Sequence, residues 1–351
     1  MTTLLLKESD LTHGANIIKD GGTVAFRTET VYGLGADATN DEAIKKIFIA
    51  KNRPQSNPLI IHFHSIQHIQ EYLDIPLDVL PLFSKVKAAL TIVLPYCRGG
   101  ILPSVVNQTG IERISPTALS NQNTIAVRIP SCKFAQKFIH ACGVPLAAPS
   151  ANTSTRPSPT RWQDVHNDLD GRIDGIFMGK QTKIGIESTV VLYNEGKLEI
   201  LRQGGISANQ LSKLAKIPVK ILQSGENLSK SPGTRFKHYS PSVPVKIIIP
   251  NQPNLKDLIN DKQVIILCLT QNKKRCKKLL ANNTKLITLG NSAKHVQTNL
   301  FAAFREAEKL LAQMNNKTEP CASTQLILIE QMPQTEDFSS INERISKASN
   351  S

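Results

Sequence analysis

The sequence predicts an α/β protein with two domains, and three features of the chain support this. Its 351 residues exceed the ~250 at which single hydrophobic cores stop growing. Short apolar runs typical of strands alternate with stretches of helical periodicity. A polar, turn-rich segment, residues 223–244, divides this alternation into a long and a short series. We therefore expect a first domain over residues 1–222, a linker over 223–244, a smaller domain over 245–335, and a polar tail over 336–351 that frays.

The first domain is expected to begin with a helix near residues 10–20, which Gly21 and Gly22 end, followed by a strand over 23–28. A threonine- and glycine-rich loop then leads to a helix over 41–51, for which Asn40 is a suitable N-cap. A later helix is expected to be capped by Ser131 and to end at Gly143. The other expected strands are 59–63, 91–94, 124–129, 144–148, 173–178, 188–193, 198–202 and 218–222, and the other helical stretches are 66–90, 161–168 and 207–215.

The second domain repeats the alternation on a smaller scale. Strands are expected at 245–249, 264–269, 285–289 and 326–330, with helical stretches between them. The helix near 293–314 places an apolar stripe on one face. Strands that alternate with helices in this way predict a Rossmann-like parallel sheet.

Composition limits the class of protein. Hydrophobic residues make up 40% of the chain, and no apolar run approaches the ~20 residues of a membrane span. The N-terminal stretch lacks a small-residue cleavage site, so we expect no signal peptide. The six cysteines show no metal-binding spacing, and several lie inside apolar patterns. These features favour a cytoplasmic protein with reduced thiols and predict no metal site.

The net charge of +14 suits anionic ligands or loose RNA contact. The basic residues are spread along the chain, so they indicate no docking face. The densest group, KKRCKK at residues 273–278, is more typical of a solvated helix face than of an RNA site.

A candidate binding site begins at the end of the helix over 41–51. Lys51 and Arg53 follow a loop that offers threonine and tyrosine hydroxyls, including Thr30, and two glycines that allow close approach of a ligand. Two cations that face a polar loop can hold phosphates or a carboxylate. Taken alone, the same pattern would equally fit an ordinary turn beside two solvated side chains.

Two further polar residues lie in apolar strands. His62 follows the basic loop, and although a strand histidine is usually structural, this one lies near the candidate site. Arg128 alternates with Val127 and Ile129 in the strand over 124–129. A buried charge is costly unless paired, so its partner is either a protein carboxylate or a substrate anion.

The hydroxyl-rich loop over 148–160 follows a strand end, where α/β proteins place ligands. The long polar loop over 97–123 is a second unusual segment. No P-loop or G-x-S-x-G motif is present, and GLGADA at 33–38 does not open a helix directly after a strand. A site rich in hydroxyls, amides and cations favours positioning and charge stabilisation, as in attack on a phosphate.

The motifs TETVYGLG, KNRPQSNPL, AVRIP, APSANTSTRPSP, ESTV and SPGTRFKHYSP occur in this order. Together they resemble the two-domain threonylcarbamoyl-adenylate synthases, whose first domain is a twisted mixed sheet of the YrdC type. The resemblance implies a nucleotidyltransferase that makes threonylcarbamoyl-AMP and pyrophosphate from L-threonine, bicarbonate and ATP, with Mg²⁺ carried by the nucleotide. A separate tRNA-modifying transferase then passes the threonylcarbamoyl group to an adenosine of ANN-decoding tRNAs.

The resemblance also implies roles for individual residues, each carried over by its motif. Around bicarbonate and the phosphates, the catalytic group would be Lys51, Arg53, Ser150 and Asn152. L-Threonine would be held by Thr30, His62, Arg128, Ala148 and Ser188, with Arg128 on its carboxylate. ATP would be held by Arg53, Asn57, Thr124, Ser150, Ser158, Arg202 and Tyr239.

The chain departs from the family pattern at three places. Arg27 replaces the usual proline, and Arg202-Gln203-Gly204 replaces Arg-Pro-Gly. Residues 85–91, KVKAALT, replace a Trp-Pro-Gly-Pro-x-Thr segment, and the loop over 97–123 follows them. Since this region lines the nucleotide side in the family, we expect the departures to affect ATP affinity first.

Two alternatives use the same first domain. A non-enzymatic double-stranded RNA-binding protein would suit the basic charge, with at least weak tRNA contact. It would need a basic groove lined with aromatic residues, which are only 5% of this chain. A carbamoyl transferase of the hydrogenase-maturation type would need zinc-finger cysteines, which the sequence lacks.

The linker is expected to do more than connect the domains. Residues 231–241 are polar, yet carry Phe236, His238 and Tyr239 close together. Exposed aromatic residues add nothing to a passive spacer, whereas a flap over an occupied site gains water exclusion from them. We predict that the linker orders over the nucleotide and that Tyr239 contacts it.

Overall fold

A computed structural model describes most of the chain, and its contacts divide into two compact units. The described residues are 2–86, 89–96, 114–222, 239–249, 258–260, 262–280, 283–315 and 325–349. The first unit contains the described residues of 1–154, 159–183 and 187–222. The second contains residues 155–158, 184–186 and those described from 239 onwards. The domain limits predicted above follow the sequence alone, whereas these units also place two short early segments with the C-terminal part of the chain.

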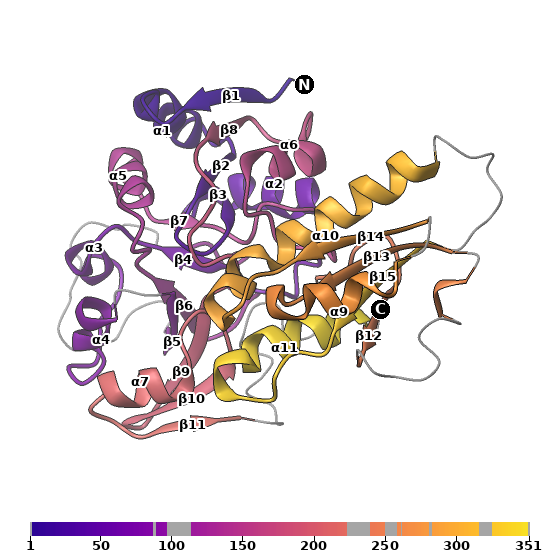
Figure 1. The fold of residues 1–351 in the computed structure, drawn as a ribbon. Coiled ribbons are helices and arrows are strands. Elements are labelled where there is room, and N and C mark those ends of the chain that lie inside the picture. The colour runs from indigo at the N-terminus through magenta and orange to yellow at the C-terminus, as the bar shows by residue number, and fades with distance from the viewer. Residues whose placement is uncertain are drawn as a thin grey trace. The chain divides into compact units, whose positions relative to one another are not determined.

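The first unit is built on a mixed sheet (Figure 1). Its strand order is β1-β8-β2-β3-β7-β4-β6-β5-β9-β10-β11. The strands are β1 (Leu4–Lys7), β2 (Val24–Arg27), β3 (Tyr32–Asp37), β4 (Ile60–His62), β5 (Leu90–Pro95), β6 (Thr124–Arg128), β7 (Leu146–Ala147), β8 (Gly175–Met178), β9 (Thr189–Asn194), β10 (Lys197–Arg202) and β11 (Val219–Ile221). The helices are α1 (Leu11–Lys19), α2 (Asp41–Lys51), α3 (Ile66–Gln70), α4 (Leu80–Lys85), α5 (Lys133–Cys142), α6 (Trp162–Leu169) and α7 (Ala208–Leu214).

Both faces of this sheet are packed. On β2, Val24 and Phe26 join a core with α1 and α5, whereas Ala25 joins a larger core with α2. This alternation follows from the two-residue period of a strand. The predicted limits of α2 are confirmed, and the side chain of Asn40 caps it by accepting from the backbone N–H groups of Glu42 and Ala43.

Three local predictions for the first unit are wrong, and one strand was not predicted. The unpredicted element is the edge strand β1, which residues 4–7 form parallel to β8. Residues 32–37, expected as loop, form β3, because their glycines pack in an antiparallel pair with β2. Residues 66–90 were expected to be helical, but in their described part only the short helices α3 and α4 precede β5. Helix α5 has Cys132 rather than Ser131 at its N-cap, without a side-chain cap.

The second unit contains a four-stranded parallel sheet, as predicted (Figure 1). Its strands are β12 (Val245–Ile248), β13 (Gln263–Cys268), β14 (Thr284–Thr288) and β15 (Gln325–Glu330), in the order β12-β15-β13-β14. The helical elements include the 3-10 turn η2 (Thr270–Asn272), α9 (Lys273–Lys277), α10 (Ala293–Asn315) and α11 (Glu336–Ser349). Helices α10 and α11 pack on one face, and Cys276 of α9 packs on the other.

The prediction that residues 336–351 form a frayed polar tail is wrong. Residues 336–349 form α11, which buries Ile341, Arg344, Ile345 and Ala348. Its polar composition concealed an amphipathic helix, since only one face needs to be apolar. The segment is therefore part of the core of the second unit.

We expect Ile345→Ala to lower the free energy of unfolding by about 2–5 kcal/mol, because it leaves a cavity between α11 and its core. Ser346→Ala, at the next and exposed position, should change it by less than about 0.5 kcal/mol. Denaturant unfolding of both variants measures the difference. Equal stabilities would mean that α11 does not pack as described.

Among the described residues, none of the helices has the length and apolar composition of a membrane span.

Candidate active site

Lys51 is the most deeply buried cation of the predicted site. It is the last residue of α2, and only 2% of it is exposed. Its Nζ donates to the backbone oxygens of Ser150 and Asn152, both at 2.5 Å. Burial, helped by the charge of Arg53, holds the pKa of Lys51 well below its ordinary value. An ammonium has three donors, and the described residues account for two, so the third can serve an anion.

Arg53 lies just beyond the end of α2, where Asn52 takes a left-handed conformation that turns the chain. Its Nε donates to the backbone oxygen of Asn57 at 3.3 Å, and its Nη2 to that of Pro58 at 3.0 Å. These bonds fix the guanidinium against its own loop while it remains half-buried. The positive charge of Arg53 lies close enough to Lys51 to help lower the pKa of Lys51.

Arg128, at the end of β6, has a buried protein partner that sequence analysis did not identify. Its Nη2 donates to Glu29 Oε1 at 2.7 Å and to Thr30 Oγ1 at 2.7 Å. Both members of the ion pair are almost fully buried. The Nε atom of Arg128 is also buried and has no hydrogen-bond partner among the described residues. The two hydrogens of Nη2 therefore serve Glu29 and Thr30, and the Nε–H is one of the donors that remain for a second anion.

The hydroxyl groups beside Arg128 form a chain that fixes their orientation. Thr28 Oγ1 donates to the backbone oxygen of Val31 at 2.7 Å, so the 2.8 Å bond between Thr28 and Thr30 uses the hydrogen of Thr30. Thr30 then accepts from Arg128. Thr30 is thus held in place before any ligand arrives.

His62 lies directly beside Arg128, because β4 and β6 are parallel and these two residues are register partners. Its Nδ1 lies 3.1 Å from the backbone oxygen of Ile60, and since a carbonyl only accepts, this nitrogen carries the hydrogen. Burial, with the charge of Arg128, lowers the pKa of His62 to about 3. The imidazole is therefore neutral at physiological pH.

This pKa predicts a pH dependence of stability. In the unfolded chain the imidazole is protonated near its ordinary pKa of about 6.5, whereas in the folded protein its pKa is about 3. The contribution of neutral His62 to the free energy of unfolding is therefore lost progressively as the pH falls from about 6.5 towards 3. We expect His62→Gln to flatten the fall in unfolding free energy between pH 7 and pH 4, by up to ~1.4 kcal/mol per pH unit. His13→Gln, at an exposed position of α1, should leave the slope near the wild-type value, and equal slopes in both variants would contradict this assignment.

Ser188 and Arg202 form a second buried polar group in the first unit. Arg202 Nε and Nη2 donate to the backbone oxygen of Ser188 at 3.2 and 3.0 Å. Ser188 Oγ is 2.8 Å from Thr91 Oγ1 and 3.3 Å from Arg202 Nη2. A residue predicted for ATP and one predicted for threonine are thus linked directly. Thr91, at the end of the KVKAALT departure, supports Ser188 and was not predicted as a site residue.

Three other predicted residues occupy strand ends or loops of the same unit. Ala148 follows β7, and its N–H donates to the backbone oxygen of Ile60. Ser150 forms an isolated antiparallel bridge with Gly33, so the loop after β7 runs beside β3. Thr124 begins β6, and its hydroxyl donates to the side-chain oxygen of Gln122 at 3.4 Å.

Ser158 and Tyr239, both predicted to contact ATP, belong to the second unit. Ser158 is buried there. The Tyr239 ring stacks on Phe301 at 5.4 Å between ring centroids, and the guanidinium of Arg344 lies 5.3 Å from its centroid. Tyr239 has a φ of 69°, in the left-handed region. Residues 231–238 of the predicted flap lie outside the described residues, so the flap remains a prediction.

One departure from the family pattern, Arg27, has a visible local basis, and Gly204, which the second departure keeps, is constrained by its surroundings. Arg27 forms an ion pair with Glu8, which follows the unpredicted strand β1, and donates to Cys132 Sγ at 3.2 Å. Gly204 lies against the backbone that carries Ser188: a Cβ at this position would come within 2.4 Å of Glu187 O and Thr189 N. The glycine at position 204 is therefore needed for the arrangement of Ser188, whatever residue precedes it. Most of the loop over 97–123 lies outside the described residues.

The fold and the site define a class of protein: an α/β protein of two units, with buried cations beside hydroxyl groups in the first unit. The sequence of this unit contains no G-x-S-x-G nucleophile motif. Comparison with known proteins identifies the family to which the chain belongs. A family model described as Telomere recombination matches residues 16–204, and one described as Threonylcarbamoyl-AMP synthase, C-terminal domain, matches residues 206–350. The chain belongs to the threonylcarbamoyl-AMP synthase family with both domains.

Similar proteins cover most of the chain. It is 37% identical over 264 residues to the threonylcarbamoyl-AMP synthase of Bacillus subtilis, covering 74% of this chain and 72% of that one. It is 33% identical over 313 residues to that of Pyrococcus abyssi, covering 87% of each. The crystal structure of P. abyssi Sua5 complexed with L-threonine superposes with a TM-score of 0.80 at 30% identity, covering 99% of this chain and 97% of that one. These similarities confirm the resemblance stated above.

Proposed function

We propose that the protein is an L-threonylcarbamoyladenylate synthase that forms threonylcarbamoyl-AMP and pyrophosphate from L-threonine, bicarbonate and ATP. The similarity over almost its whole length to a protein solved with L-threonine carries this proposal. The arrangement around Arg128 supports it, because three of the five residues predicted for threonine lie together: Arg128 and His62 are register partners, and Thr30 is bonded to Arg128.

The reaction needs two bond-forming steps. The threonine amine adds to bicarbonate and gives a carbamate with loss of water. A carbamate oxygen then attacks the α-phosphorus of ATP, and pyrophosphate leaves. Neither step requires a protein nucleophile, which agrees with a site made of cations, hydroxyls and amides.

Three protein groups are assigned to these steps. Arg128 binds the threonine carboxylate through the donors that Glu29 does not use. Lys51 directs its remaining N–H at the carbamate or α-phosphate and stabilises the negative charge that develops there. Arg53 adds a second positive charge for the phosphates. An arriving anion also offsets the burial that lowers the pKa of Lys51, so it favours the charged ammonium.

Mg²⁺ is proposed to arrive on the triphosphate, where it would neutralise the leaving pyrophosphate. In the first unit, the described residues include no group of three histidine, cysteine or acidic side chains close enough to hold a metal on their own.

The protein is proposed to act in the cytoplasm and to supply its product to a second enzyme. The product is a mixed anhydride and must pass quickly to a tRNA-modifying threonylcarbamoyl transferase, which suits a cytoplasmic enzyme. The basic charge allows weak tRNA contact, but RNA is not needed for the reaction. The comparisons do not favour the alternative of a non-enzymatic double-stranded RNA-binding protein.

The test is ATP cleavage by the purified protein with each substrate omitted in turn. We expect pyrophosphate release that depends on both L-threonine and bicarbonate and does not depend on RNA. Release of orthophosphate, or equal cleavage without threonine, would contradict the proposed function.

A further inference from the structure

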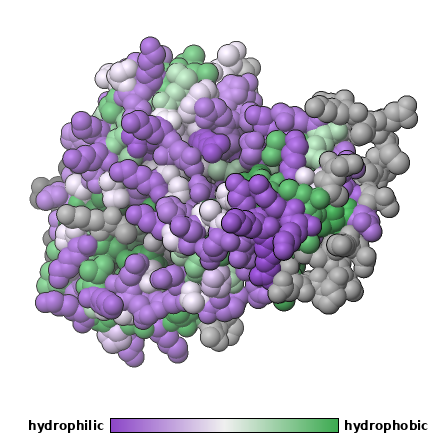
Figure 2. Space-filling model, in the orientation of Figure 1, coloured by the Kyte–Doolittle hydropathy of each residue, from purple (hydrophilic) through white to green (hydrophobic). Residues whose placement is uncertain are grey.

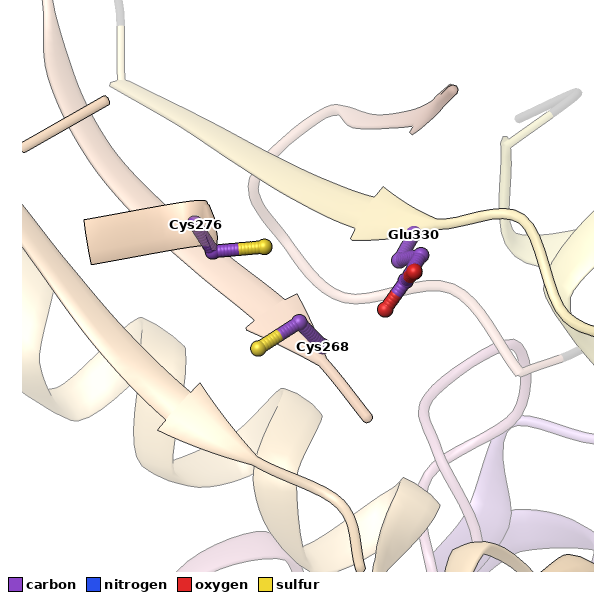
Figure 3. Close-up of side chains that lie close together, drawn as sticks. All are labelled: Cys268, Cys276 and Glu330. Atoms are coloured by element: carbon purple, nitrogen blue, oxygen red, sulfur yellow. The ribbon is translucent and has the colours of Figure 1, made fainter. Parts of the chain in front are cut away.

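The second unit contains a buried cluster of metal-binding side chains far from any predicted catalytic motif in the sequence. Cys268 is the last residue of β13, Cys276 lies on α9, and Glu330 is the last residue of β15. The two sulfur atoms and a carboxylate oxygen all lie within 4.8 Å of one another, and all three residues are buried. Figure 3 shows these side chains gathered from the two strand ends and the helix.

The fold explains why these residues meet. β13 and β15 are parallel neighbours with Leu267 opposite Ile329, so the next residues, Cys268 and Glu330, lie side by side at the carboxyl ends of their strands. Helix α9 begins shortly after β13 and turns Cys276 back onto the same face. The spacing in sequence gave no sign of a metal site, because the donors come from three separate elements.

Glu330 has no cationic partner in the described part of the chain. Its Oε2 accepts from the N–H of Leu269 at 2.9 Å, and its Oε1 accepts from the side-chain amide of Asn272. Both donors are neutral, and no ion pair between described residues involves this carboxylate. A buried carboxylate is costly unless a positive charge compensates it. The two hydrogen bonds orient the carboxylate and leave further lone pairs on both oxygens for a cation.

Both thiols are free and buried, and they pack in one core that lies between β13, α9 and β15. Helix α9 exposes its basic residues, which form a hydrophilic patch in Figure 2, and buries only Cys276. The basic side chains of the KKRCKK segment are therefore solvated, and the thiol of Cys276 alone points into the core.

We propose that Cys268, Cys276 and Glu330 bind one Zn²⁺ ion. Two thiolates and a carboxylate form a donor set that zinc prefers, and water completes the tetrahedron. Binding displaces two thiol protons to solvent. The three ligands carry three negative charges against two on the ion, and the basic residues of α9 offset the remainder. The ion would join α9 to the ends of β13 and β15, and so add to the stability of the second unit.

Cobalt(II) is the direct probe, since its thiolate complexes absorb in the near ultraviolet whereas those of zinc do not. The full-length protein is reduced, stripped with a chelator and titrated with Co²⁺. We expect one equivalent to give a thiolate-to-cobalt band that Zn²⁺ displaces. Zn²⁺ should also raise the midpoint of thermal unfolding.

The variants separate these donors from other buried thiols. Cys276→Ser and Glu330→Gln should each lower Co²⁺ affinity at least tenfold, and Cys276→Ser should also reduce the band. Cys142→Ser removes a buried thiol from the first unit and should leave the band unchanged.

Two results would overturn the proposal. One is the absence of a thiolate-to-cobalt band in the reduced wild-type protein, which decides the matter even if the variants fail to fold. The other is a Cys268–Cys276 disulfide, found by peptide mapping after exposure to air, that forms as readily with excess Zn²⁺ as without it. That result would make the pair a redox couple, because bound zinc protects its thiolates from oxidation.

Discussion

Replacing Lys51 with alanine is expected to lower turnover by ~10²-fold or more, the loss typical when a preorganised charge is removed from a transition state. The effect should be large because Nζ is buried and already held by two carbonyl oxygens, so it needs no reorganisation when the substrate arrives. Arg53→Ala should cause a loss of the same order. Steady-state pyrophosphate release with saturating substrates measures both.

Lys45→Ala is the matched control for this prediction. Lys45 lies on the same helix, α2, but its side chain is exposed and pairs with Glu42. It should remain within twofold of wild type. Because Lys51→Ala also leaves the carbonyls of Ser150 and Asn152 without their donor, the unfolding of each variant must be measured in parallel. A folded Lys51→Ala protein with near wild-type turnover would show that Lys51 only supports the loop after β7.

Arg128→Ala is expected to have two separable effects. Loss of a charged partner for the carboxylate should weaken L-threonine binding by about 10- to 100-fold. The same change leaves Glu29 buried and unpaired, which should lower the free energy of unfolding by about 3–5 kcal/mol. Calorimetric titration with threonine and denaturant unfolding measure the two effects independently.

Arg27→Ala provides the comparison, since Arg27 is also a strand-end arginine paired with a glutamate. Its pair with Glu8 is only partly buried, so its removal should cost about 1 kcal/mol or less. Glu29→Gln keeps the size of the side chain and removes the competing charge. It should destabilise the protein and yet retain threonine binding. An Arg128→Ala protein with unchanged threonine affinity would show that the Glu29 ion pair is purely structural.

The sequence predicted the fold well where local signals agree with the final packing. Helix α2 has its cap, acidic first turn and apolar face within one segment, so its limits are confirmed. β3 was not predicted, because glycines weaken the strand signal and only the pairing with β2 makes this segment a strand. α11 was expected to fray, because its polar face outweighs the few apolar residues that the second unit buries.

The site was predicted in part for the same reason. Lys51, Arg53 and Arg128 were predicted as site residues because a cation in or beside an apolar element needs an explanation, and the structure shows that Lys51 and Arg128 are buried. The sequence could not decide whether Arg128 pairs with a protein carboxylate or with a substrate anion. The structure shows a protein carboxylate, Glu29, as one partner. Its position in TET, next to Thr30, was the available signal. Cys268, Cys276 and Glu330 gave no local signal, since only the parallel register of β13 and β15 brings them together.

We propose that the residues around Lys51 and Arg128 join L-threonine, the carbon of bicarbonate and the adenylyl group of ATP in one product. The most direct measurement follows labelled bicarbonate in the purified protein without RNA. We predict that the label appears in an adenylylated product only when L-threonine and ATP are both present, together with one pyrophosphate for each product formed. ATP cleavage to AMP and pyrophosphate without labelled product, or labelled product formed without threonine, would contradict it.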